Sequence, residues 1–106
     1  MKQPIRIHPG EILREEFMAP LGLSANQLAL ELRTPASRMY DIVHERRGIT
    51  TDTAARLGRF FGVSAHFWMN LQNTYDLFLL EDSLAGELSR IQPHLAVESS
   101  SSSLPK

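Results

Sequence analysis

Cysteine is absent from this 106-residue sequence, so the chain has neither a disulfide nor thiolate chemistry. No apolar run approaches the length of a membrane span, and residues 1–10 (MKQPIRIHPG) lack the apolar centre of a secretory signal. Glycine-rich phosphate loops and nucleophile elbows are missing as well. We therefore expect a protein that stays in the cytoplasm and has no membrane partner.

Candidates for a metal or catalytic centre are also scarce. The four histidines are scattered, and none stands four residues from another, as a helical metal site requires. The neighbouring carboxylates Glu15 and Glu16, like Glu81 and Asp82, point in different directions around a helix, unlike an acid–base pair that flanks a scissile bond. We expect no metal, no cofactor and no enzymatic activity.

Charge is small in total, with a formal net value of −1, but it is unevenly distributed. Between residues 73 and 106 five acids oppose two basic residues. Such an asymmetry is typical of a protein that binds an anionic partner on one side and a different partner on the other, although solvated arginines scattered over a surface explain it equally well. In the basic middle of the chain, residues 33–59, three acids are opposed by six arginines: Arg33, Arg38, Arg46, Arg47, Arg56 and Arg59.

Proline, glycine and hydroxyl residues divide the chain into helices and leave no convincing strand. Pro9 marks a helix start, and Pro20 with Gly22 marks a stop, so a first helix is predicted over residues 9–19. N-capping residues at positions 50–52 and a stop at Gly62 predict a fourth helix between them.

The stretch between these helices, residues 24–49 (SANQLALELRTPASRMYDIVHERRGI), predicts two short helices joined by a tight turn. Ser24 with Gln27 three residues later forms a capping-box signature, and Thr34 followed by Pro35 predicts a second N-cap with proline at the first helical position. Each helix turns its apolar residues to one face, and the second keeps a polar outer face. A helix-turn-helix that presents its second helix to the major groove has this layout.

A longer helical segment begins at Ser64 and contains no glycine or proline between residues 65 and 85, as one helix or as two with a bend near Asn73. Phe67 and Trp68 stand at core spacing, which we favour over an aromatic platform. An apolar stripe follows, and it suits plain core, a dimer seam or a partner-docking face: Leu77, Leu80, Leu84, Leu88 and Ile91. We predict one domain over residues 1–91 and a flexible serine-rich tail over residues 92–106.

Several motifs carry a resemblance to a known family. They are HPGEILREEF (residues 8–17), PLGLS (20–24), RGIT (47–50), TAARL with FFG (53–62) and, above all, FWMNLQNTYDL (67–77). With them the chain resembles the HigA (VapI-like) antitoxins of the Xre-type helix-turn-helix class. The resemblance implies an all-α, lambda-repressor-like helix-turn-helix domain of five to six helices with a C-terminal helical extension. The sequence departs from the family pattern at two positions. Tyr40 stands where asparagine is frequent, and Arg33 stands where the turn usually has glycine.

The same resemblance implies a bacterial antitoxin that neutralises a RelE-like, HigB-type mRNA-cleaving toxin. As a homodimer it would repress its own operon at an inverted-repeat operator in double-stranded DNA, and so be found at the nucleoid. A basic toxin would be attracted to the acidic surface beyond Asn73 and around Glu11, Glu15 and Glu16. The alternative is a free-standing Xre-type repressor without a toxin partner, because the DNA arguments are common to both.

DNA-contacting residues are expected on and beside the second helix of the pair. Arg38 can reach a guanine edge with two hydrogen bonds or clamp a phosphate, Ser37 can donate or accept, and Ala36 can touch a thymine methyl. Arg46 and Arg47 are placed for the phosphate backbone. The full set expected to contact DNA is Gln27, Thr34, Ala36, Ser37, Arg38, Tyr40, Asp41, Arg46 and Arg47.

Overall fold

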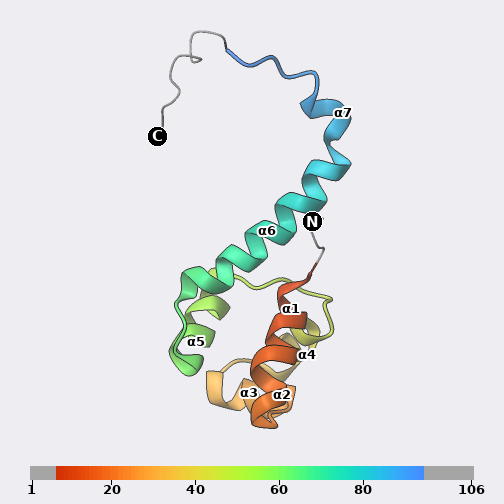
Figure 1. Ribbon diagram of the computed structural model, residues 1–106. Coiled ribbons are helices and arrows are strands. Elements are labelled where there is room, and N and C mark those ends of the chain that lie inside the picture. Colours follow the sequence, from red (N-terminus) through yellow and green to blue (C-terminus); the bar gives the residue numbers. More distant parts are fainter. Residues whose placement is uncertain (1–6, 95–106) are drawn as a thin grey trace.

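The computed structural model describes residues 7–94, which form an all-helical body with a projecting C-terminal arm (Figure 1). The predicted all-α class is therefore confirmed. From residue 95 onward, the predicted tail lies outside the described residues. Within residues 7–94, no helix is long and apolar enough to cross a membrane.

The first helical segment consists of α1 (Pro9–Ile12), the π-helix η1 (Leu13–Met18) and α2 (Ala19–Leu21). The imidazole Nδ1 of His8 caps it by accepting the N–H of Gly10 at 2.8 Å. The segment continues past its predicted end at Ala19, and Pro20, which has no N–H to donate, lies just after the junction of η1 with α2. Gly22, with φ of +65°, ends it in the left-handed conformation.

The predicted helix-turn-helix is formed by α3 (Ala25–Leu32) and α4 (Ala36–Val43). The capping box is confirmed, because Ser24 and Gln27 exchange backbone-to-side-chain hydrogen bonds of 2.9 and 3.1 Å. The predicted N-cap at Thr34 is wrong. The N–H of Thr34 still donates to Ala29 O of α3, so α4 begins one residue later, with Pro35 as its N-cap. Arg33 takes the left-handed conformation in the turn, with φ of +60°.

The remaining helices are α5 (Thr51–Phe61), α6 (Ala65–Ser83) and α7 (Ala85–Leu88). Hydroxyl caps at Thr50 and Ser64 begin α5 and α6 as predicted, and Gly62 ends α5. Since α6 runs unbroken past Asn73, the break comes only at Leu84, between α6 and α7.

The core lies between the first segment, α3, α4, α5 and the first half of α6. Trp68 is fully buried, and its ring lies 4.8 Å from that of Phe17 and 5.1 Å from that of Phe67. The interpretation of Trp68 as core is thus confirmed. Between residues 73 and 94, by contrast, no residue is buried, and the apolar stripe from Leu77 to Ile91 is mostly exposed. Plain core is therefore wrong for this stripe, because the described residues contain no element that covers it.

Candidate nucleic-acid interface

Helix α4 divides its residues sharply between the core and the surface. Met39 and Ile42 are fully buried and Val43 nearly so. On the opposite side Ala36, Ser37 and Tyr40 are exposed, and Arg38 and Asp41 are partly exposed. Neither polar side chain at positions 37 and 38 contributes to the core, so this face is available to a partner.

An open hollow of 290 Å³ lies on this face, between the first turns of α3 and α4. Its walls are mainly apolar, and the residues that line it are Asn26, Ala36, Ser37, Tyr40 and Asp41. An apolar recess of this kind suits the methyl group that thymine presents in the major groove.

The guanidinium of Arg38 is held by a carboxylate from another helix. Its Nη1 lies 3.4 Å from Oδ2 of Asp52, in the first turn of α5. The same Oδ2 accepts a hydrogen bond of 3.0 Å from Nε of Arg56. Arg56 also donates to the carbonyl oxygens of Leu32 and Arg33, at 3.0 and 3.4 Å. Asp52 and Arg56 together thus link α4 to the turn that precedes it.

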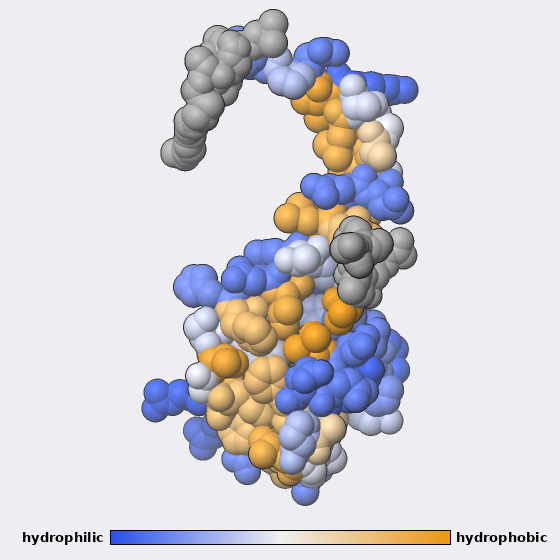
Figure 2. All heavy atoms as spheres, in the orientation of Figure 1, coloured by the Kyte–Doolittle hydropathy of each residue, from blue (hydrophilic) through white to orange (hydrophobic). Residues whose placement is uncertain are grey.

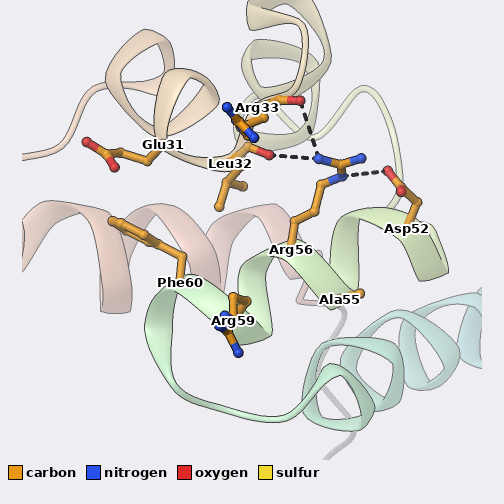
Figure 3. A pocket seen from close by; sticks show the side chains of 8 residues that line it. All are labelled: Glu31, Leu32, Arg33, Asp52, Ala55, Arg56, Arg59 and Phe60. Atoms are coloured by element: carbon orange, nitrogen blue, oxygen red, sulfur yellow. Dashed lines mark hydrogen bonds and ion pairs between the residues drawn. The ribbon is translucent and has the colours of Figure 1, made fainter.

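Figure 3 shows the contacts of Arg56 with Asp52, Leu32 and Arg33. They lie beside a second hollow, of 530 Å³, between the end of α3 and α5. Arg33, Arg56 and Arg59 line it, with Glu31 and Asp52 as the opposing carboxylates and Phe60 as its aromatic wall. Arginines that the sequence spreads over residues 33–59 therefore meet along one border of the helix-turn-helix.

Asp41 forms ion pairs with Arg46 and Arg47. Its carboxylate lies 3.1 Å from Nη2 of Arg46 and 3.9 Å from Nη2 of Arg47, just past the end of α4. The guanidinium of Arg46 also stands 5.8 Å from the ring centre of Tyr40. The ring of Tyr40 in turn lies 4.2 Å from that of His44. Asp41 and Tyr40 therefore position the arginines beside the outer face of α4.

Gln27 and Thr34 lie at the edges of this face. The Oε1 of Gln27 is occupied by the capping box, so its structural role is local. The hydroxyl oxygen of Thr34 is buried and makes no hydrogen bond within the described residues. Of the expected contacts, the structure brings Ala36, Ser37, Tyr40 and Asp41 together around one hollow and leaves Thr34 turned inward.

The far end of α4 is fixed by Arg14 of η1. Its Nη1 donates to the carbonyl oxygen of Val43, the last residue of α4, and both of its terminal nitrogens lie 3.3 Å from Oε2 of Glu45. Hydrogen bonding to Glu15 and Glu45 raises the pKa of Arg14 above its ordinary value, so this side chain stays charged. The charged guanidinium also complements the negative end of the helix dipole.

Sequence reasoning missed Arg14, Asp52 and Arg56 as supports of α4. Asp52 was assigned only to an N-cap, and its neighbour Thr50 in fact supplies the cap. The spacing of four residues between Asp52 and Arg56 is a helical ion-pair signal that points to their pairing. The approach of Arg38 to Asp52 crosses from one helix to another, and no local pattern reports it.

Known proteins are similar to this chain in sequence and in fold. No family model matches the chain. Virulence-associated protein I of Dichelobacter nodosus is 57% identical over 75 residues, which cover 71% of this chain and 69% of that protein. The structure of the Pseudomonas aeruginosa antitoxin HigA with the higBA promoter superposes with a TM-score of 0.80 at 46% identity, covering 86% of this chain and 98% of that one. PA4674 of P. aeruginosa, in complex with its 18-bp operator DNA, gives a TM-score of 0.83 at 45% identity and covers 88% and 99%.

Proposed function

Because the chain belongs to the VapI-like HigA antitoxin family of helix-turn-helix DNA-binding proteins, we propose that it represses its own operon with α4 as the reading helix and neutralises a HigB-type toxin. One observation carries the DNA part of this proposal. The outer face of α4 exposes Ser37 and holds Arg38 at its border, while the inner face is fully used by the core. The similar proteins crystallised with operator or promoter DNA support the same role.

In this proposal the nine expected residues divide the work. Arg38 and Ser37 read base edges, Ala36 and Tyr40 supply the apolar contacts, and Asp41 accepts from a base or orients its arginines. Arg46 and Arg47, exposed just beyond α4, bind phosphates and set the register. Gln27 and Thr34 border the site.

A binding titration on operator and random duplexes tests these roles. Arg38→Ala should lose about 1–3 kcal/mol on the operator and much less on random DNA, because a bidentate base contact carries the discrimination. Arg47→Ala should weaken both and reduce the salt slope by about one. Arg90→Ala is the matched control, since Arg90 is an exposed arginine that pairs with Glu87 on the arm. An equal loss on both duplexes for Arg38→Ala would contradict base reading.

We assign the toxin and the second copy to the arm formed by α6 beyond Asn73 and by α7. Exposed leucines lie there beside Asp76, Glu81, Asp82 and Glu87, and Figure 2 shows apolar and hydrophilic surface along this arm. An acidic surface with an apolar stripe suits a basic nuclease, and the same stripe suits a homodimer seam.

Co-expression with the toxin tests the division between the two ends of the molecule. The double variant Ser37→Ala with Arg38→Ala should lose repression and still rescue growth, because neither side chain packs in the core. Its fold is checked by circular dichroism. A folded double variant that no longer protects the cells would show that the two functions share a surface. Failure of the unaltered protein to protect them would favour the free-standing repressor.

A further inference from the structure

The acidic residue at the border of the reading helix is the feature that the DNA-binding role leaves unexplained. Asp52 is exposed, with a side chain that is 55% accessible, and it stands in the first turn of α5. A carboxylate near a phosphate backbone costs binding energy, because like charges repel. Its neighbours are the two arginines that the DNA surface would otherwise offer freely, Arg38 and Arg56.

The two contacts of Asp52 differ in kind. Arg56 is anchored independently, because it donates to the carbonyl oxygens of Leu32 and Arg33 as well as to Asp52. Within residues 7–94 the guanidinium of Arg38 makes one polar contact, from Nη1 to Oδ2 of Asp52, and that contact is long at 3.4 Å. An exposed ion pair of this kind is weak and breaks when a better partner arrives. Asp52 is therefore held in place by its hydrogen bond with Arg56, whereas its weaker contact with Arg38 can be released.

We propose that Asp52 is a specificity-determining residue that holds Arg38 back from the phosphates of random DNA and releases it only to a matching base edge. This inference rests on the proposed reading role of Arg38. A guanine edge offers two hydrogen bonds in the fork geometry of arginine and compensates for the broken ion pair. A single phosphate contact compensates less, and the remaining carboxylate repels that phosphate. Asp52 therefore lowers nonspecific affinity more than operator affinity.

The test compares Asp52→Asn with Glu16→Gln on a random duplex and on the operator, in the absence of toxin. Both variants remove one negative charge without changing side-chain size. Glu16 is exposed in η1, outside the arm and outside α4, so it reports the effect of net charge alone. The asparagine amide oxygen at position 52 can still accept from Arg56, and thermal melting checks that the fold is kept.

Asp52→Asn should tighten binding to the random duplex about two- to fivefold more than Glu16→Gln does. The salt slope on that duplex should steepen by about 0.9, the value for one further phosphate neutralised. The operator affinity should change less, so the specificity ratio falls. In an Arg38→Ala background, Asp52→Asn should tighten binding to the random duplex no more than the control substitution does, because the arginine that Asp52 restrains is gone.

Two results would overturn the inference, and they distinguish a failure of the role of Asp52 from a failure of DNA reading by Arg38. If Arg38→Ala weakens operator binding but Asp52→Asn and Glu16→Gln behave alike on random DNA, Asp52 has no such role and the proposed DNA reading stands. If Arg38→Ala leaves operator binding unchanged, the DNA reading by Arg38 fails, and the role of Asp52 fails with it.

Discussion

A substitution at Gly10 tests how closely α1 packs on the reading helix α4. Gly10 is buried in α1, and its N–H is held by His8 Nδ1. A Cβ at this position would overlap the carbonyl oxygen of Ile42, a backbone atom of α4 that cannot rotate away. Gly10→Ala therefore has to separate two packed helices.

The magnitude follows from two opposing terms. Overpacking against a rigid neighbour costs about 3 kcal/mol, and alanine recovers about 1 kcal/mol of helix propensity. We expect a net loss of about 2 kcal/mol or more, equivalent to a melting temperature lower by about 10 °C for a domain of this size. Because α4 is displaced, operator binding should weaken too.

Urea unfolding followed by circular dichroism measures this loss, with Gly86→Ala as the matched control. A Cβ on Gly86 of α7 meets no atom within 4 Å, so the same substitution there should be neutral or stabilising by up to about 1 kcal/mol. If Gly10→Ala unfolds at the same urea concentration as the unaltered protein, the close packing of α1 on α4 is not what holds the reading helix in place.

Three further predictions concern the remaining supports of the fold and of the arm. Gln72→Leu should cost about 1–3 kcal/mol in urea unfolding, because the buried Gln72 Oε1 accepts the Ile49 N–H at 2.6 Å, whereas Asn73→Leu on the exposed side should cost little. Burial lowers the pKa of His8 below its ordinary value of 6.5. The charges of Glu45 and Asp76 raise this pKa by less than burial lowers it, and Arg14 lowers it slightly further. The unfolded chain therefore binds this proton more tightly, so stability should fall as pH drops below 6.5 towards the lowered value, and His8→Asn should reduce that fall in melts across the range. Leu80→Lys should convert a dimer to a monomer in light scattering if the arm is the seam, and an unaltered protein that is monomeric both free and on DNA would contradict dimerisation through it.

The local part of the fold was predictable from the sequence, and the contacts between helices were not. Ser24, Thr50 and Ser64 announce helix starts because a cap acts within three residues of itself. Thr34 misled because its N–H still donates to Ala29 O at the end of α3, so that Pro35 itself takes the capping position of α4. The wide turn of η1 and the Arg38–Asp52 approach depend on packing between distant segments. The periodic stripe from Leu77 was visible, but periodicity says only that residues share a face, and the exposure of that face required the structure.

Hydrogen exchange in the projecting half of α6 should show whether a partner covers the apolar stripe of the arm. Backbone amides between Leu77 and Ser83 belong to the second half of α6, which has no buried side chain, since burial within α6 ends at Gln72. In the free monomer these amides should exchange with deuterium through local fraying, long before those around Trp68, which open only with the whole domain. A partner that covers the stripe must slow that exchange. Protection at residues 77–83 therefore registers the arm's occupant, whichever protein it is, without any change in the helix-turn-helix.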